Sequence, residues 1–220
     1  MNATTHTHFG GFSLVLAAVC WALGPASGTP LRAQVYDAVN DFSLNSNPND
    51  PWSYGTLSSF TGGTFTLLTV TREDLDYPGQ TAWSNGQSFP NLAVADKNTS
   101  GVEQRFSSVV MPPDLLRLDG QSLIASVRWV APADDVYDLR ALFQHIDTQT
   151  VPVSTHIILN GTTELFAVDG LTAFGDRRLL HLPGFALSAG DVLDFAEGAP
   201  QPNSDSTGLA VTITGSGGGG

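Results

Sequence analysis

A hydrophobic period of two residues constrains this chain more than any other feature of its sequence. From residue 123 onward, apolar side chains alternate with polar ones in one segment after another. Successive side chains of a β-strand point to opposite faces, so this period predicts strands with one buried face. We expect strands at 123–130, 137–143, 153–159, 163–168, 179–187, 191–196 and 209–214, with weaker candidates at 64–70, 91–95 and 107–111.

Turn residues between these segments indicate how the strands connect. Residues 131–135 predict a hairpin between the first two strands, and Asn160-Gly161 is the strongest hairpin signal in the chain. No helical period lasts longer than two turns, and residues 114–118 are expected to form one helical turn at most. Short strands separated by frequent turns are typical of an all-β sandwich or barrel. Residues 45–101 are richer in turn residues, so we expect short strands and long loops there.

Residues 12–23 form an apolar run that is followed by small residues, which is the pattern of a secretory signal peptide. The run is shorter than the roughly 20 residues that a membrane-spanning helix needs. Cleavage fits after Gly28 or after Ala33, and we prefer Ala33 because the patterned region begins at Gln34. We therefore expect residues 1–33 to be removed and the mature protein to be secreted and soluble.

Residues 34–214 show no break in composition and are expected to fold as a single domain. Residues 215–220 consist of glycine and serine, which predicts a flexible tail. The single cysteine, Cys20, lies in the expected signal peptide. The mature chain would then contain no disulfide, no thiolate nucleophile and no cysteine-ligated zinc.

The charge balance limits the partners of this chain. It contains 21 acidic residues against nine basic ones, for a net charge of −12. Such a chain lacks the basic surface that binds phosphate backbones, so we exclude nucleic acid as a partner. An acidic exterior instead keeps an exported protein soluble.

Several short motifs resemble a family of secreted bacterial β-sandwich domains. They lie at residues 36–43, 47–49, 52–55, 127–132, 136–139, 157–161, 187–195 and 205–209, and together they span most of residues 35–214. Domains of this family resemble jelly-roll carbohydrate-binding modules and often occur in exported proteins with a Pro-Glu-Pro sorting tail. The resemblance implies an antiparallel, jelly-roll-like β-sandwich in the extracellular space. No Pro-Glu-Pro motif follows Thr214, so we do not expect surface anchoring by that route.

Three aromatic residues beside turns are candidates for binding a polysaccharide. Trp52, Tyr54 and Trp83 lie near turn residues, and Asn85 follows Trp83 closely. Exposed rings stack on the apolar faces of sugars, while amide and carboxylate groups bond the hydroxyls. The alternative is that these rings close the ends of the sandwich. Trp129 shares a strand face with apolar residues and is expected to be core.

Two acidic residues are candidate ligands for a structural calcium ion. Asp41 lies near the first strand and Asp205 just before the last, and these strands often lie close together in a jelly roll. With Asn40, Asn203 and backbone carbonyls, the two carboxylates would offer the hard oxygen ligands that calcium prefers. The alternative is that these residues only shape turns, because Asp and Asn favour turns.

The remaining ionisable residues favour no catalytic site. His145, His156 and His181 lack metal-ligand spacing and are expected on sheet faces. A hydrolase would need two acidic side chains roughly 5–10 Å apart, and the candidates are Asp138, Asp147, Glu164, Asp191 and Asp194. No serine-hydrolase, phosphate-loop or dinucleotide motif is present.

These observations favour a noncatalytic, secreted module that binds polysaccharide. One alternative is a structural or adhesive extracellular protein that associates with itself or with a surface component. The other alternative is a hydrolase or lyase that acts on glycans.

Overall fold

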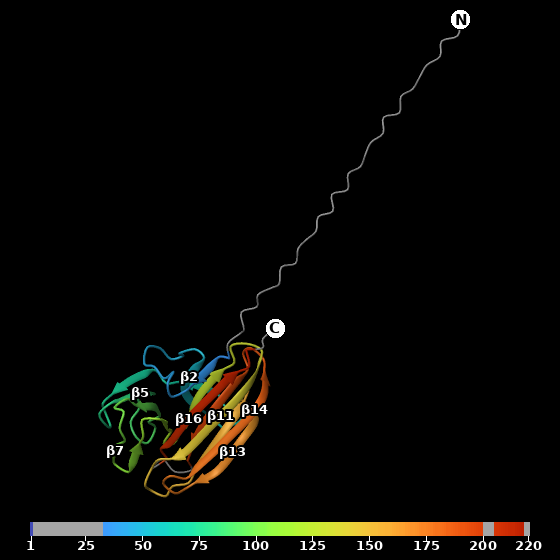
Figure 1. Cartoon of the computed structure of the whole chain (residues 1–220). Coiled ribbons are helices and arrows are strands. Elements are labelled where there is room, and N and C mark those ends of the chain that lie inside the picture. Colours follow the sequence, from blue (N-terminus) through green and yellow to red (C-terminus); the bar gives the residue numbers. More distant parts are fainter. Residues whose placement is uncertain (2–32, 200–204, 218–220) are drawn as a thin grey trace. The chain divides into compact units, whose positions relative to one another are not determined.

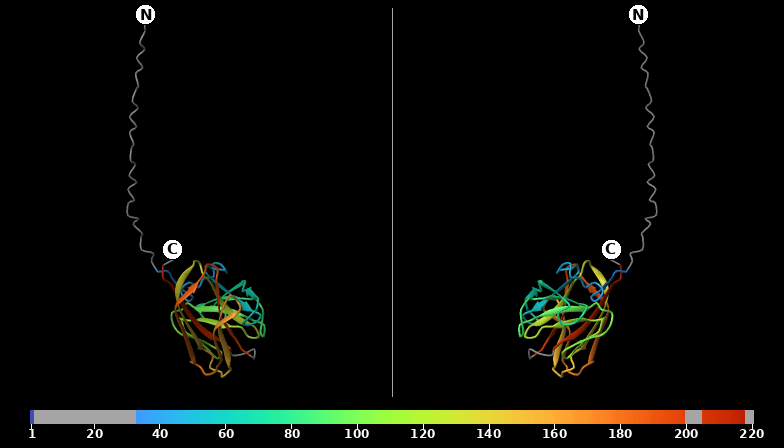
Figure 2. Two further views of the ribbon diagram at one scale, coloured as in Figure 1. Left: turned by 90° about the vertical axis from the view of Figure 1, so that its right-hand side faces the viewer. Right: turned by 90° about the vertical axis from the view of Figure 1, so that its left-hand side faces the viewer.

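Sixteen β-strands and no helix make up the described part of the chain, which comprises Met1, residues 33–199 and residues 205–217 of a computed structural model. All pairings between the strands are antiparallel, and the strands form two stacked layers (Figures 1 and 2). The prediction of an all-β, antiparallel β-sandwich is therefore confirmed.

The larger sheet contains eight strands. In spatial order they are β14 (Arg177–Leu187), β11 (Asp135–His145), β16 (Thr207–Gly215), β9 (Leu116–Asp119), β6 (Val94–Asn98), β5 (Gln80–Ser84) and β4 (Val70–Glu73), and β1 (Val35–Asp37) also pairs with β16. Figure 1 views this sheet with β16, β11 and β14 side by side.

The smaller sheet contains six strands, and a separate hairpin completes the fold. The order in the smaller sheet is β13 (Thr163–Leu171), β12 (Val153–Leu159), β15 (Val192–Gly198), β10 (Ile124–Val130), β2 (Trp52–Leu57) and β3 (Phe65–Leu67). The hairpin consists of β7 (Gln104–Phe106) and β8 (Val109–Met111). Because β14, β15 and β16 alternate between the sheets, the last part of the chain joins the two layers.

The predicted alternation builds the core between the two sheets. Trp129 on β10 and Phe143 on β11 point inward and are almost fully buried, as the sequence predicts. Their neighbours Arg128 and Gln144 point to the outer faces. Burying one large apolar side chain contributes about 1.5–3 kcal/mol, so these inward rows hold the layers together.

One local prediction is wrong, and residues 114–118 take another form than the one helical turn allowed for them. Residues 123–130 and 137–143 do not form a hairpin, because β10 belongs to the smaller sheet and β11 to the larger one. The alternation is the same whether a strand pairs with its neighbour in sequence or crosses to the other layer. Residues 114–118 form no helical turn; residues from Leu116 onward form β9, between β16 and β6.

The first third of the domain contributes more to the sheets than the sequence predicts. Strands β2, β5 and β6 lie inside their sheets, and most of their residues are buried. A strand covered on both faces shows no alternation between apolar and polar residues. This is why the period of two is weak there although the strands exist.

The ends of the described chain only partly match the expected boundaries. Strand β16 continues to Gly215, and the amides of Ser216 and Gly217 donate to the Val136 carbonyl and the Asp135 carboxylate. The tail expected from residue 215 therefore begins with residues that contact the domain. The expected signal peptide lies almost wholly outside the described residues. Among the described residues, no helix is long and apolar enough to cross a membrane.

Candidate functional site

The aromatic residues predicted to bind sugar lie in the core, which corrects that prediction. Trp52 and Tyr54 are fully buried, and Trp83 is 6% exposed. The indole N–H of Trp52 donates to Asp41, and that of Trp83 donates to the Ser43 carbonyl. Successive side chains of β2 and β5 point to opposite faces of their sheets, and these three rings lie on the faces that turn toward the core. They therefore close the core and offer no surface for stacking.

The other predicted binding residue, Asn85, organises its own loop. Its Nδ2 donates to the Asn91 carbonyl at 2.7 Å, and its Oδ1 accepts from the amides of Gln87 and Ala93. Both ends of the side chain are thus occupied within residues 85–93. Asn85 shapes this loop, and the loop carries a different aromatic residue, Phe89, to the surface.

The two residues predicted to bind calcium do not meet. Asp41 accepts bonds from the Asp37 amide and the Trp52 indole, and Asp37 pairs with Thr212 in β16. Asp205 precedes the other end of β16. Antiparallel pairing of β1 with β16 therefore separates the two carboxylates along that strand. Asn203 lies outside the described residues, and Asn40 binds Asp37 instead.

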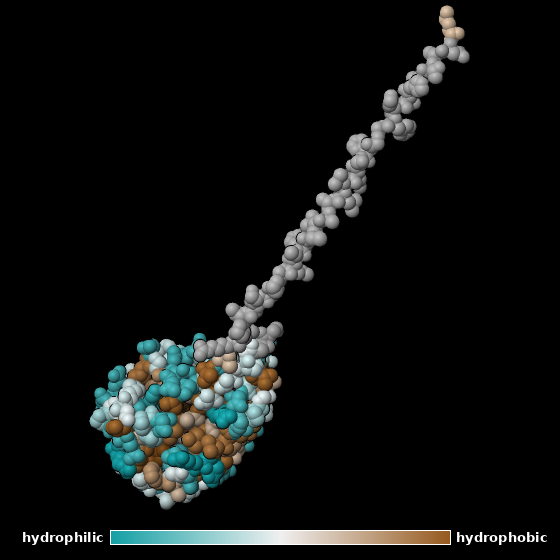
Figure 3. Space-filling view, viewed as in Figure 1, coloured by the Kyte–Doolittle hydropathy of each residue, from teal (hydrophilic) through white to brown (hydrophobic). Residues whose placement is uncertain are grey.

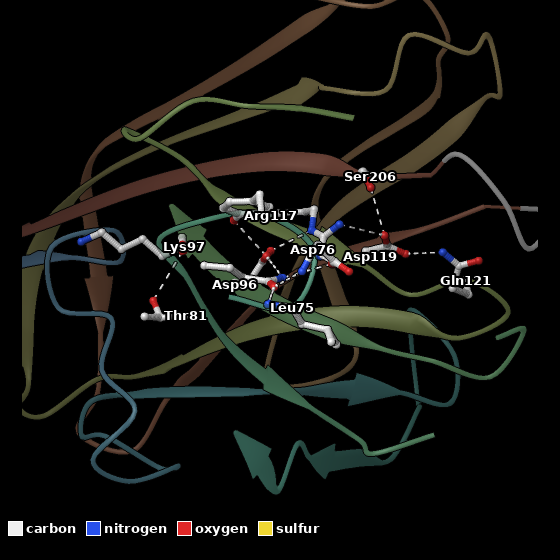
Figure 4. Close-up of polar contacts among 11 residues, drawn as sticks. Leu75, Asp76, Thr81, Asp96, Lys97, Arg117, Asp119, Gln121 and Ser206 are labelled. Atoms are coloured by element: carbon white, nitrogen blue, oxygen red, sulfur yellow. Dashed lines mark hydrogen bonds and ion pairs between the residues drawn. The ribbon is translucent and has the colours of Figure 1, made fainter. Parts of the chain in front are cut away.

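Several ionisable side chains instead gather at one end of the sandwich, where β9 ends and β16 begins. Arg117 and Asp119 lie on β9, and the register pairs Leu118 with Thr207 at the start of β16. Figure 4 shows Arg117, Asp119, Gln121 and Ser206 close together. Strand register thus brings residues from two distant parts of the sequence to one place.

Arg117 is the centre of a buried ionic network. The side chain is 3% exposed, and its guanidinium binds Asp96 at 2.8 Å and Asp76 at 2.9 Å, with Asp119 at 3.6 Å. Burial by itself lowers the pKa of Arg117, but the charges of Asp96, Asp119 and Asp76 outweigh burial and raise the pKa. The ring of Phe106 covers the guanidinium at 4.6 Å. We call Arg117, Asp76 and Asp96 the arginine network.

A second group of acids, Asp119, Glu197 and Asp205, adjoins the arginine network, and we call it the acid cluster. Glu197 and Asp205 are fully buried, and none of their four carboxylate oxygens has a partner in good hydrogen-bond geometry among the described residues. Asp119 joins the two groups: its oxygens accept from Gln121 at 2.6 Å and from Ser206 at 3.0 Å.

When it is ionised, the acid cluster carries more negative charge than the described residues around it neutralise. Burial, together with the charge of Asp119, raises the pKa of Asp205 to about 8. The amides of Asp205 and Gln121 face that carboxylate and partly offset the shift, without reaching hydrogen-bond geometry. Burial and the charges of Asp205 and Asp119 raise the pKa of Glu197 well above its usual value. The cluster therefore favours protons or an added cation.

The donors near the acid cluster suit a hard cation. Carboxylate oxygens predominate, and the Oε1 atom of Gln121 is also buried without a partner. Among the described residues, no three His, Cys, Asp or Glu side chains converge as a complete metal site. Calcium accepts six to eight oxygens, including amide and backbone carbonyls, so two carboxylates with Gln121 can begin such a shell. Zinc prefers nitrogen and sulfur, which this cluster lacks.

A pocket of about 240 Å³ opens beside Asp119, and we call it the end pocket. It is lined by two rings, by carboxylates, and by amide and hydroxyl groups, among them Phe89, Phe106, Ser108, Asp119, Gln121 and Asp147. Phe89 is 58% exposed. Asp147 accepts from the Ser108 hydroxyl at 3.0 Å and from the Gln149 amide at 2.8 Å, which fixes the polar wall.

The histidines and the candidate catalytic acids lie apart from the end pocket, except for Asp147. His181 is on an outer sheet face, His156 is on a covered outer face, and His145 is buried with both ring nitrogens bonded to carbonyls. Each remaining acid has its own partner: Asp138 binds His181 and Arg140, Glu164 binds His156, Asp191 binds Asn160, and Asp194 binds Arg128.

Two signals in the sequence could have located this site. Leu193, Phe195 and Glu197 share one face of a strand by the period of two, so Glu197 is a carboxylate at an inward position. Phe89 lies among turn residues, as do the tryptophans that we singled out. The contact between Asp119 and the region of Asp205 carries no sequence signal, because it depends on the pairing of β9 with β16.

The sequence matches no protein-family model and no curated protein. The likeness to secreted domains with sorting tails therefore stays a prediction.

Solved structures similar to this chain include carbohydrate-binding modules. A family 35 carbohydrate-binding module from Clostridium thermocellum is 12% identical, with 66% of this chain and 95% of that chain covered and a TM-score of 0.35. A CBM61 module solved with β-1,4-galactotriose is 9% identical, with 74% and 88% covered and a TM-score of 0.32.

A β-(1,4)-mannanase with GH26 and CBM35 parts, from Podospora anserina, is 18% identical, with 67% of this chain covered and a TM-score of 0.34. This chain spans only 27% of the mannanase chain.

Proposed function

We propose that this protein is a noncatalytic carbohydrate-binding module that holds a neutral sugar of a polysaccharide in the end pocket. The observation that carries the proposal is the exposed ring of Phe89 beside a wall of carboxylate, amide and hydroxyl groups. An aromatic face suits the apolar side of a sugar ring, and the polar wall suits its hydroxyls. The proposal keeps the ligand class that the sequence predicts and moves the site to other residues.

Affinity electrophoresis against soluble β-1,4-linked glucan, mannan, xylan and galactan tests this proposal. We expect retardation by at least one polysaccharide, and about a tenfold loss of affinity in Phe89→Ala, since losing one stacked ring costs on the order of 1–1.5 kcal/mol. Phe174→Ala is the matched control, because Phe174 is also exposed (47%) but lines another pocket.

Absence of retardation by all four polysaccharides would contradict the proposal, and so would equal affinity of Phe89→Ala and the wild type. Release of reducing ends or unsaturated sugars from any of them would favour the hydrolase or lyase alternative.

We also propose that the acid cluster binds one calcium ion, with Glu197, Asp205 and the Oε1 atom of Gln121 as its first ligands. The support is the pair of buried carboxyl groups, Glu197 and Asp205, that no cation among the described residues pairs with. A bound ion stabilises the folded state by mass action, about 2.7 kcal/mol when its concentration is 100 times its Kd. The role of the ion would be structural, because Glu197 and Asp205 are fully buried.

Thermal melting with calcium chloride and with a chelator tests the ion. We expect the calcium-loaded protein to melt about 5–10 °C higher, from the size of the domain. Equal melting temperatures at saturating calcium would contradict the proposal. Magnesium is the comparison ion, since it demands stricter geometry and gives up its water reluctantly.

The self-association alternative would use the exposed apolar residues of the larger sheet. Leu179 on β14 is 76% exposed and Val136 on β11 is 45% exposed. Figure 3 shows apolar surface on this side of the molecule in patches between hydrophilic areas. Size-exclusion chromatography distinguishes the alternatives, because we expect a monomer if sugar binding is the function. The expected site of action is the extracellular space.

A further inference from the structure

His145, at the end of β11, holds the loop that follows it through both nitrogens of its ring. The loop consists of residues 146–152 and leads to β12, and we call it the histidine loop. Nδ1 of His145 contacts the Asp147 carbonyl and Nε2 contacts the Val151 carbonyl, each at 3.0 Å. Residues 148–150 between these carbonyls are exposed and belong to no strand. The loop is therefore closed around a fully buried imidazole ring.

These two contacts indicate the charge state of the ring. A carbonyl oxygen only accepts hydrogen bonds, whereas a neutral imidazole has one N–H and one nitrogen with a free lone pair. Both contacts of His145 are therefore hydrogen bonds only when both nitrogens carry protons. In a neutral ring, one lone pair would face a carbonyl oxygen at 3.0 Å inside the protein, which costs free energy. The geometry thus fits an imidazolium cation.

The charge of this imidazolium is held by carbonyl groups and not by an ion pair. Among the described residues, the histidines that form ion pairs are His156 and His181. The pKa of Asp176 is lowered chiefly by two backbone amides of its own turn, and more weakly by the charges of Arg178 and His145. The charged groups on the segments that pair with or adjoin the histidine loop are Asp147 in the loop, Asp176, Arg177 and Arg178 on the side of β14, Asp205 before β16 and Arg105 in the β7–β8 hairpin.

The histidine loop carries part of the wall of the end pocket. Asp147 and Gln149 both line that pocket, and His145 does not. Thr148, between them, donates to the Ser108 carbonyl through both its amide and its hydroxyl, at 2.9 Å each. The ring of His145 can therefore affect a ligand in the end pocket only through the positions of Asp147 and Gln149.

We propose that His145 is a positioning residue of the end pocket: its imidazolium form holds the pocket wall in place, and sugar binds more weakly once the ring loses a proton. Histidine changes its charge between roughly pH 5 and pH 8. At low pH both carbonyls are held. As the pH rises, one hydrogen bond is lost and its carbonyl faces a lone pair, so Asp147 and Gln149 are no longer fixed. Only the effect on sugar rests on the proposed function.

NMR of the imidazole and amide groups of the full-length protein, from pH 5 to pH 8, tests the proton. Calcium chloride is present so that the proposed ion keeps Asp205 ionised. We expect both ring nitrogens of His145 to be protonated at pH 5, and the amide signals of residues 146–151 to shift with the same midpoint as the ring. The change is local, so the melting temperature should hardly follow it. A ring that carries a single proton throughout overturns the inference.

Affinity electrophoresis at pH 5 and pH 8, with the polysaccharide that retards the protein most, tests the effect on binding. We expect the wild type to bind about fivefold more weakly at pH 8, because a smaller fraction of the protein has the pocket wall in place. His145→Gln keeps an amide donor but cannot be charged, so its affinity should be equal at both pH values. His181→Gln is the control and should keep the wild-type profile, because His181 pairs with Asp138 on an outer sheet face.

The outcomes separate this inference from the proposed function. Equal wild-type affinity at both pH values overturns the inference and leaves the end pocket as a sugar site. A pH dependence that survives in His145→Gln also overturns it and points to the acid cluster. Binding at neither pH overturns the proposed function, and the NMR titration then decides alone whether the proton orders the loop. If His145→Gln fails to fold, the wild type decides, because its ring and loop signals must share one midpoint.

Discussion

The arginine network and the acid cluster place buried carboxylates in adjoining parts of one sandwich, yet their charges are balanced differently. In the arginine network, Asp96 is fully buried but binds a guanidinium at 2.8 Å. In the acid cluster, Glu197 and Asp205 are equally buried, and no cation among the described residues pairs with them; only backbone amides and the Asp119 carboxyl group face them. The carboxylates of the arginine network are thus neutralised by Arg117. The carboxyl groups of the acid cluster depend on protons or a cation from solution.

The difference indicates which buried charges support the fold and which mark a site. A buried ion pair with good geometry recovers much of the cost of leaving water, whereas an uncompensated carboxylate does not. Asp119 lies between the two groups. Its Oδ2 atom is 3.6 Å from Nη1 of Arg117, and its charge helps to raise the pKa values of Asp205 and Glu197. A site for a cation is thus expected where the guanidinium no longer reaches.

The largest expected effect comes from removing the cation of the arginine network. Arg117→Met leaves Asp96 buried without a partner, so we expect a loss of about 3–5 kcal/mol and a melting temperature roughly 10 °C lower. Thermal or urea unfolding measures this. Arg140→Met is the control, because the Arg140–Asp138 pair is exposed and its loss should hardly change the midpoint. Similar unfolding midpoints for Arg117→Met and Arg140→Met would contradict the idea that Arg117 balances the buried charge of Asp96.

A smaller effect is expected from pH in protein kept free of metal by a chelator. The folded-state pKa of Asp205 is about 8, above its ordinary value of 3.8, so the folded state binds the proton more tightly than the unfolded state. The stability that Asp205 contributes is therefore fully present below its ordinary pKa and is lost as the pH rises toward 8. Between pH 5 and pH 8 we expect the melting temperature to fall by about 4–8 °C. Saturating calcium should flatten the profile, and a profile already flat in chelator would contradict the assignment.

The smallest effect is expected when one charge of the acid cluster is removed. At pH 8 in chelator, Glu197→Gln should raise the melting temperature by about 2–4 °C, since it removes a carboxylate without a partner while keeping its shape. The same variant should no longer respond to calcium. Glu103→Gln is the matched control, because the Glu103 side chain is 50% exposed. A calcium response that survives in Glu197→Gln would place the ion elsewhere.

The sequence predicted the later strands much better than the earlier ones. Strands β10 to β16 have one face toward the core, and for most of them the period of two located the strand within a few residues. Strands β2, β6 and β9 are covered on both faces, so their sequences lack that period. The sequence therefore predicts a loop at β2, a weak strand at β6 and at most a helical turn at β9. The period reports which face is covered, and it fails when both faces are covered.

The candidate site was much harder to predict than the fold. Asp205 was identified as a possible ligand from its place before the last strand, but its predicted partner, Asp41, lies toward the other end of β16. The same pattern of rings beside turns pointed to Trp52 and Trp83, which are buried, although it also fits Phe89, which is exposed. A turn next to an aromatic residue does not show whether the side chain of that residue faces the core or the solvent.

By itself, the sequence determined the antiparallel sandwich, the Asn160-Gly161 hairpin and the inward position of Trp129, because alternation and turn preference are local properties of the chain. Only the tertiary structure decided that Asp119 lies beside Glu197 and Asp205, and that the loop of residues 58–64 crosses the outer face of the smaller sheet. These contacts join segments far apart in the sequence, and strand register and loop packing bring them together without leaving a local pattern.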